Sequence, residues 1–168
     1  NALPGQYLHN SGATMPSIYW NTAARAATRK GVSMATEQMF CVQCEQVAKC
    51  EACTGGAGVC GKPADVADAQ DALTGTMIAL ACTAREAGVK NERICDLIVD
   101  GLFTCMTNVN FDGEAVTALA DAVRAETAAV AATAGIAPAP DYDIDQIWSD
   151  DEDVRSLKSL VLFGLRGT

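Results

Sequence analysis

Residues 63–88 have the sequence PADVADAQDALTGTMIALACTAREAG, and this stretch carries the helical period that decides the fold. Pro63 suits the start of a helix, and Gly88 suits the position just after its last residue. Apolar side chains recur between them three, four or seven residues apart, as one face of an α-helix requires. These residues are Val66, Leu73, Met77, Leu80 and Ala84. The stretch therefore predicts one long helix.

Three further helical patterns follow it. The first covers residues 91–106, and the second begins at Asp112, a residue that can cap a helix, and ends before Gly135. An acidic linker, residues 138–153, leads into the last helix, which starts around Asp151 and is apolar on more than one side. We expect five of its residues to be buried: Val154, Leu157, Leu160, Val161 and Leu165. A helix of this kind needs a partner on each flank, so we expect a longer polypeptide.

Composition fits an all-α fold. A chain of 168 residues is long enough for one domain with a core, and its aromatic content of 5% is low for a β-sandwich. The net charge of −9, with no Lys/Arg cluster, argues against a nucleic-acid partner. No apolar run reaches the length of a membrane span. The prediction is a helical bundle preceded by a Cys/Gly-rich loop at residues 40–63.

The first 36 residues differ from the rest of the chain. They contain no Asp or Glu, and their only Lys and Arg residues are Arg25, Arg29 and Lys30. This composition is typical of an organellar transit peptide. Alternatively, the segment is an extension upstream of a true start at Met34. We exclude residues 1–36 from the fold and assign residues 37–168 to one helical domain. The compartment is predicted as cytoplasmic, or as a mitochondrion or plastid if this segment is a transit peptide.

Five cysteines lie within the loop, and their spacing is the main chemical signal. Cys41 and Cys44 form one C-x-x-C pair, Cys50 and Cys53 form another, and Cys60 follows. Disulfides are disfavoured, because no secretory signal is present and closely spaced pairs make poor cross-links.

Two alternative kinds of metal site fit these thiols. Four thiolates suit tetrahedral Zn²⁺, although the gap between the pairs is short for a zinc ribbon. They also suit an iron–sulfur cluster, and the glycines of TGGAGVCG, residues 54–61, allow backbone N–H groups to approach sulfur. The same stretch nearly matches a phosphate-binding loop, but Pro63 stands where that loop needs Ser or Thr. Three other cysteines lie on helical patterns, where we expect them to pack: Cys82, Cys95 and Cys105.

Three ordered motifs resemble one family. The first is MFCVQCEQ (39–46), which continues to GVCGKP (58–63) and QDAL (70–73). The second is GLFTCMTNVNFD (101–112), and the third is DEDVRSLKSLVLFGLRG (151–167). Together they resemble the N-terminal portion of the hybrid cluster proteins, also called hydroxylamine reductases, over residues 34–167.

The resemblance implies a ligand set. Cys41, Cys44, Cys53 and Cys60 match the family's four N-terminal ligands, while Cys50 falls outside the pattern as a spare thiol or a rival ligand. The short spacing resembles that of members with a [4Fe–4S] cluster rather than a [2Fe–2S] cluster. The family's hybrid iron–sulfur–oxygen cluster is held by His, Glu and Cys residues of later domains. No catalytic residue is therefore assigned in this chain.

The implied function is electron relay within an oxidoreductase. Its implied substrate is hydroxylamine, which is reduced to ammonia, or nitric oxide, which is also reduced, or both. This portion alone is expected to be inactive. Its expected partners are the remainder of the same polypeptide and a redox protein such as a ferredoxin or an NADH-dependent reductase. The alternative is a stand-alone Cys-rich binding module with a zinc or redox-sensing site. A relation to the carbon monoxide dehydrogenases is the weaker enzymatic alternative, because their cysteine pattern differs.

Overall fold

The computed structural model describes residues 39–44, 46–50, 52–107 and 111–166, which all belong to the second of two units, Thr36–Thr168. The predicted domain boundary after residue 36 lies outside this range and stays a prediction. The described elements are the helices α1 (Ala64–Ala87), α2 (Glu92–Thr107), α3 (Gly113–Ala134) and α4 (Glu152–Arg166) and the 3₁₀ turns η2 (Ala48–Cys50) and η3 (Ile144–Ser149). Strand pairing among the described residues is limited to two isolated bridges. The predicted all-α class is confirmed.

The ends of α1 and α3 follow from local chemistry. Gly88 adopts a left-handed conformation with φ 66°, and the N–H of Val89 after it donates to the Ala84 carbonyl at 2.9 Å. This arrangement satisfies carbonyl groups that the last helical turn leaves without partners. At the start of α3, the Asp112 carboxylate accepts from the Ala115 N–H at 2.9 Å. The predicted caps therefore lie where the sequence places them.

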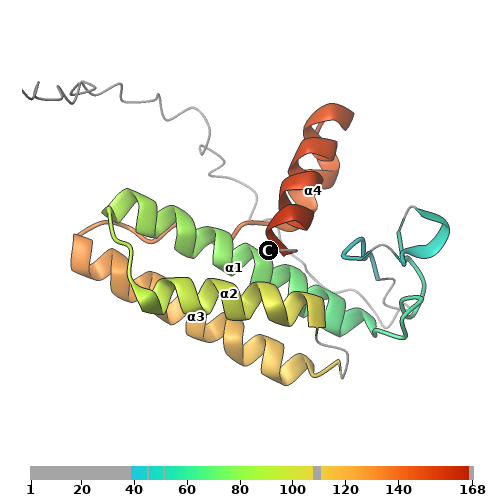
Figure 1. Ribbon diagram of the computed structural model, residues 1–168, viewed down its shortest axis with the longest axis horizontal. Helices are drawn as coiled ribbons and strands as arrows, with labels where there is room; N and C mark the ends of the chain where they lie inside the picture. Colours follow the sequence, from blue (N-terminus) through green and yellow to red (C-terminus); the bar gives the residue numbers. More distant parts are fainter. Residues whose placement is uncertain (1–38, 45, 51, 108–110, 167–168) are drawn as a thin grey trace, which may run out of the picture. The chain divides into compact units, whose positions relative to one another are not determined.

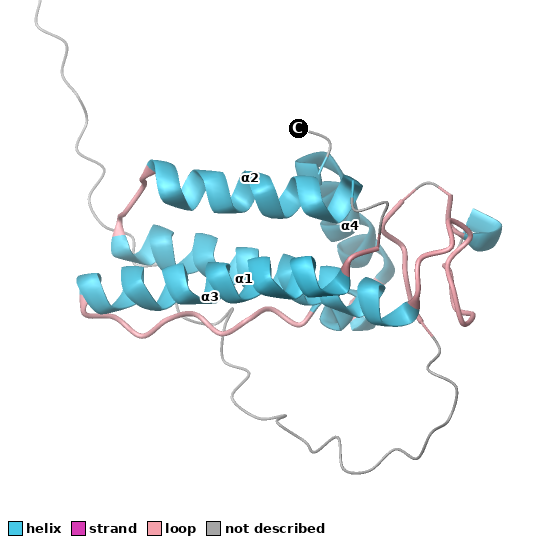
Figure 2. Cartoon of the chain, turned by 90° about the horizontal axis from the view of Figure 1, so that it is seen from below, coloured by secondary structure: helices cyan, strands magenta, loops and turns pink. Residues whose placement is uncertain are grey.

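Helices α1, α2 and α3 contact one another pairwise and lie alongside each other (Figures 1 and 2). Helix α1 contacts α2, α3 and η3, and its pairing with α3 is the most extensive in the described structure. The core between the three helices consists of Leu73, Met77, Leu80, Ala84, Ile94, Leu97, Cys105, Val116, Ala120, Val123 and Val130. All five apolar residues that predicted α1 are buried, four of them in this core. Their burial supplies the main favourable free energy of folding.

The segment between α3 and η3 packs along α1. The Ala139 N–H donates to the Thr83 hydroxyl at 3.0 Å, and the Tyr142 N–H donates to the Gly75 carbonyl at 3.2 Å. A Cβ atom at Gly75 would collide with the Tyr142 carbonyl oxygen. The glycine therefore lets the backbone cross α1 closely. The predicted acidic linker, residues 138–153, contains η3 and runs into the start of α4.

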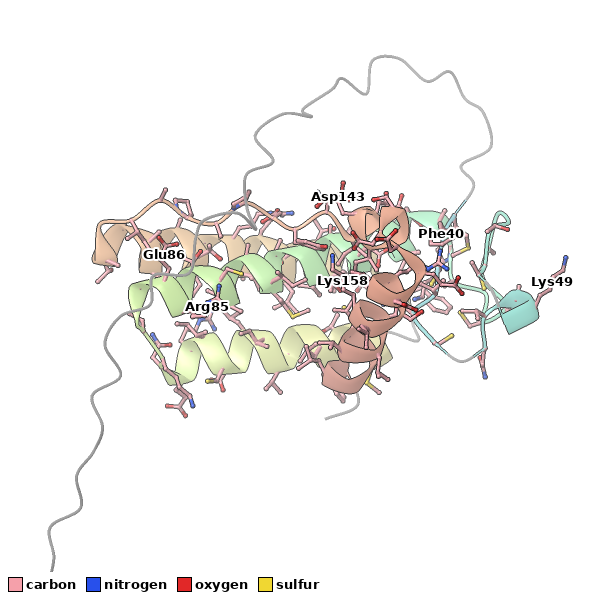
Figure 3. The ribbon with its side chains drawn as sticks, turned by 90° about the horizontal axis from the view of Figure 1, so that it is seen from above. Phe40, Lys49, Arg85, Glu86, Asp143 and Lys158 are labelled. Carbon is pink, nitrogen blue, oxygen red and sulfur yellow. The ribbon has the colours of Figure 1, made fainter. Side chains whose placement is uncertain are left out.

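Helix α4 contacts α2 and η3. Lys158 lies on α4 (Figure 3). It donates to the Asp150 carboxylate at 2.5 Å and to the Tyr142 hydroxyl at 3.5 Å, and its hydrogen bond to Asp150 raises its pKa. Five large apolar residues on the helix are 41% to 68% exposed: Val154, Leu157, Leu160, Val161 and Leu165. The prediction that they are buried is wrong, because α2 and η3 cover only part of the surface of α4. No helix in the described part of the chain is long and apolar enough to cross a membrane.

Replacing Gly75 with Ala is expected to destabilise the bundle. The new methyl group must displace the Tyr142 backbone from α1, at a cost of about 1–3 kcal/mol in the free energy of unfolding. Gly164→Ala is the matched control, because Gly164 lies in α4 and its ideal Cβ position has no contact within 4 Å beyond its own stretch of helix. Urea unfolding followed by circular dichroism measures both variants. Equal unfolding free energies for the two variants would contradict the close crossing.

Candidate metal centre

The chain of the cysteine loop reverses direction so that Cys41 and Cys53, whose residues are buried, pair through their backbones. The Cys41 N–H donates to the Cys53 carbonyl at 3.0 Å, and the Cys53 N–H donates to the Cys41 carbonyl at 2.9 Å. Both residues are 6% exposed and pack with Met39, Ala64 and Ala67 in a second apolar cluster. Two predicted ligands, twelve positions apart in the sequence, are therefore paired through their backbones at the start of α1.

Cys60 lies in a second, tighter turn of the loop. The Gly58 N–H donates to the Lys62 carbonyl at 2.8 Å, and the Gly61 N–H donates to the Gly58 carbonyl at 2.9 Å. Gly61 has φ 87°, a conformation that residues with a side chain rarely adopt. The Cys60 Sγ lies 3.4 Å from the ideal Cβ position of Gly58, so the glycine leaves room for the sulfur. Cys60 is exposed, and so is Cys44.

The two buried thiols differ in their electrostatics. Backbone hydrogen bonds from Val59 and Ala48 lower the pKa of Cys53, and the Lys62 charge acts in the same direction. Burial raises the pKa of Cys41, against the opposing effects of a backbone hydrogen bond from Gln43 and of Lys62. Hydrogen bonds and a nearby cation favour the thiolate, which is the form that binds a metal. The surroundings of Cys53 therefore suit a ligand thiolate.

The loop fits a thiolate-bound metal centre in its donor chemistry, but the described residues do not form a ready-made ligand group. No set of three His, Cys, Asp or Glu side chains in the described part of the chain could hold a metal ion together. Cys41, Cys44, Cys53 and Cys60 are free of disulfides. The Cys50 side chain lies outside the described residues. The structure thus pairs two of the four predicted ligands at the backbone and leaves the other two exposed on the same loop.

A partly buried polar network joins the loop to α1. The Lys62 ammonium donates to the Gln43 side-chain oxygen at 2.9 Å and to the Gln70 side-chain oxygen at 2.5 Å. The Gln43 amide donates in turn to the Asp71 carboxylate at 2.7 Å, and the Gln70 amide donates to the Thr104 carbonyl of α2 at 3.5 Å. Hydrogen bonds between buried groups specify one arrangement of the chain. The network therefore links the loop to two helices.

Sequence reasoning missed this network, although its members stand in the quoted motifs. Gln43 belongs to MFCVQCEQ, Lys62 to GVCGKP, and Gln70 and Asp71 to QDAL. The available signal was the recurrence of long polar residues beside the cysteines and at the start of a helix that packs against apolar neighbours. Spacing alone does not reveal which of them face one another.

The cysteines on the helices have different environments. Cys105 is buried in the core, and its sulfur lies 3.6 Å from the Thr74 hydroxyl and donates to the Gln70 carbonyl. Cys82 is half-buried, whereas Cys95 is exposed. The packing prediction is confirmed for Cys105 and is wrong for Cys95, which lies on the outer face of α2.

Alkylation of the metal-free, reduced chain is expected to separate the loop thiols into two classes. Cys44 and Cys60 should react with iodoacetamide at least about tenfold faster than Cys41 and Cys53, because a buried thiol reacts only after local opening. Cys95 and Cys105 serve as exposed and buried internal controls. Peptide mass spectrometry after timed quenching measures the six rates. Equal rates for Cys41 and Cys44 would contradict the described packing of the loop.

Comparison with known proteins places this loop and bundle in one family. Residues 39–168 match the model of the Prismane/CO dehydrogenase family. Curated relatives named hydroxylamine reductase include those of Desulfitobacterium hafniense (strain Y51), 35% identical, and Caldanaerobacter subterraneus subsp. tengcongensis, 36% identical. Each match covers 77% of this chain and 28% of the relative, so the matched part is little more than a quarter of their length. The chain belongs to the Prismane/CO dehydrogenase family, in agreement with its resemblance to the hybrid cluster proteins.

Proposed function

We propose that this chain is the iron–sulfur, electron-relay portion of a hydroxylamine reductase. Cys41, Cys44, Cys53 and Cys60 are proposed to hold a [4Fe–4S] cluster. The observation that carries this proposal is the backbone pairing of Cys41 with Cys53 at the start of α1, in a chain whose relatives are named hydroxylamine reductase. A cluster of this type takes four thiolates and transfers single electrons.

The surroundings of the loop support the ligand assignment. Backbone hydrogen bonds to the Cys53 thiol stabilise its thiolate, as hydrogen bonds to cluster ligands do in proteins generally. Cys41 and Cys53 are buried, whereas Cys44 and Cys60 are exposed. The exposed ligands would give a bound cluster the access that an incoming electron requires. The electron donor is proposed to be a ferredoxin or an NADH-dependent reductase.

The chemistry of the longer polypeptide is proposed by analogy with the relatives' name. Hydroxylamine accepts two electrons and two protons, its N–O bond breaks, and ammonia and water are released. Reduction of nitric oxide is the second candidate reaction. The ligands of the proposed hybrid cluster are not assigned in this chain, whose role is to deliver single electrons to that centre.

The exposed face of α4 fits a contact with the remainder of such a polypeptide. Leu157, Leu160 and Val161 are each at least 60% exposed on this face. On α2, which contacts α4, Val99, Phe103 and Met106 are also more than half exposed. Apolar patches of this kind mark surfaces that another part of a protein covers. The proposed partner is the later part of the family's longer chain.

Iron and sulfide analysis of the anaerobically purified chain tests the ligand set. The wild-type chain is expected to hold four iron and four sulfide, as a [4Fe–4S] cluster requires, and Cys41→Ser or Cys60→Ser is expected to lose most of both. Cys50→Ser is the matched control in the same loop and should retain the cluster. Stoichiometric zinc without iron after reconstitution would instead support the Cys-rich binding module. Cluster loss in Cys50→Ser would overturn the ligand assignment.

Hydrogen exchange tests the proposed covering of α4. In this chain, the backbone amides of α4 are expected to exchange much faster than those of α1, because α4 has few tertiary contacts. In a full-length hydroxylamine reductase such as the Desulfitobacterium hafniense relative, the matching helix should be protected. Mass spectrometry of both proteins under the same conditions provides the comparison. A matching helix that stays unprotected at full length would contradict the proposed contact.

A further inference from the structure

Lys62 is a buried cation whose hydrogen-bond partners are neutral. The residue is only 8% exposed, and its ammonium donates to the side-chain oxygens of Gln43 and Gln70. Among the described residues, no carboxylate lies within ion-pair distance of this ammonium. The nearby Asp71 carboxylate accepts instead from the Gln43 amide. Lys62 is therefore a buried charge that the described part of the chain leaves without a directly paired anion.

Such a charge is costly unless an anion lies near it. Removing an ammonium from water costs several kcal/mol, and neutral hydrogen-bond acceptors offset only part of this cost. Lys49 provides the contrast within the same loop, because it is exposed and extends outward from η2 (Figure 3). The burial of Lys62 therefore points to an anion that belongs beside it.

Lys62 lies beside the proposed ligands. The Cys60 sulfur and the Lys62 Cβ lie 3.4 and 3.8 Å from the same point, the ideal Cβ position of Gly58. Lys62 lies two residues after Cys60, and its Gln43 partner lies between Cys41 and Cys44. The ammonium is thus held between α1 and the segment that carries the four proposed ligands. A cluster held by four thiolates is itself an anion, and reduction adds one more negative charge.

We propose that the Lys62 ammonium is the buried counter-charge of the thiolate-bound cluster and a positioning residue that raises its reduction potential. This inference rests on the proposed function. A fixed positive charge stabilises the reduced cluster more than the oxidised one, because the reduced cluster is more negative. Gln43 and Gln70 hold the ammonium in place without neutralising it. Lys62 therefore favours acceptance of an electron by the loop.

The decisive variant is Lys62→Met, which keeps a long apolar stem and removes the charge. At a fixed solution potential, the ratio of reduced to oxidised cluster is expected to fall about tenfold, which corresponds to a midpoint potential about 59 mV lower for a one-electron couple. Lys49→Met is the matched control, because an exposed charge is screened by solvent. Lys62→Arg keeps the positive charge and should keep most of the potential. A dithionite titration of the full chain followed by EPR measures all four proteins.

A second measurement separates a counter-charge from a purely structural lysine. Lys62→Met removes both the charge and the hydrogen bonds to Gln43 and Gln70, whereas Gln70→Met removes one of these hydrogen bonds and keeps the charge. Both variants are expected to lower the urea midpoint of the metal-free chain, because each leaves a buried polar group without its partner. In the cluster-bound chain, Lys62→Met should release iron to a chelator several-fold faster than Gln70→Met. Equal rates of iron release from the two variants would overturn the inference.

The outcomes distinguish this inference from the function on which it rests. A wild-type chain that takes up no iron would overturn the proposed function and the counter-charge with it. A wild-type chain with a full cluster, whose Lys62→Met variant has an unchanged midpoint potential, would overturn the counter-charge alone. A lowered potential in Lys62→Met, with Lys49→Met and Lys62→Arg close to the wild type, would support it.

Discussion

The attachment of the cysteine loop to the first turns of α1 is the constraint on which the rest of the structure depends. One face of α1 packs against α2 and α3. In its first turns, Ala64 and Ala67 pack with Cys41 and Cys53 in one buried cluster. Hydrogen bonds between Lys62, Gln43 and Gln70 add a polar connection at the same place. Any centre held by the loop is therefore fixed in position against a helix, and ligands supported by rigid elements keep their geometry more precisely than ligands on free loops.

The bundle could be predicted because its signals are local. The apolar period of α1 and the caps at Gly88, Asp112 and Gly135 depend on residues close in the sequence, and the structure places them as expected. The burial of the α4 residues could not be predicted in the same way. A period shows which residues share a face, but burial depends on what packs there, and α4 contacts only α2 and η3 among the described elements.

The candidate site was predictable in its residues and not in its arrangement. Four cysteine positions followed from resemblance, whereas the bridge between Cys41 and Cys53 depends on a chain reversal that spacing does not encode. Lys62 and Gln70 stand eight residues apart, one in the loop and one in a helix, and nothing in their spacing predicts contact. Buried polar contacts arise from the tertiary fold. Sequence patterns can therefore indicate which polar residues stand out, but not which of them pair with one another.

We propose that this loop, fixed to α1, carries a four-iron cluster as an electron relay in a hydroxylamine reductase. A Mössbauer spectrum of the full 168-residue chain, loaded with ⁵⁷Fe and kept free of oxygen, tests this proposal most directly. We expect one spectral component from iron in a tetrahedral thiolate and sulfide environment, with the delocalised valence of [4Fe–4S]. A spectrum of two localised ferric sites, as in [2Fe–2S], or no protein-bound iron at all would contradict it.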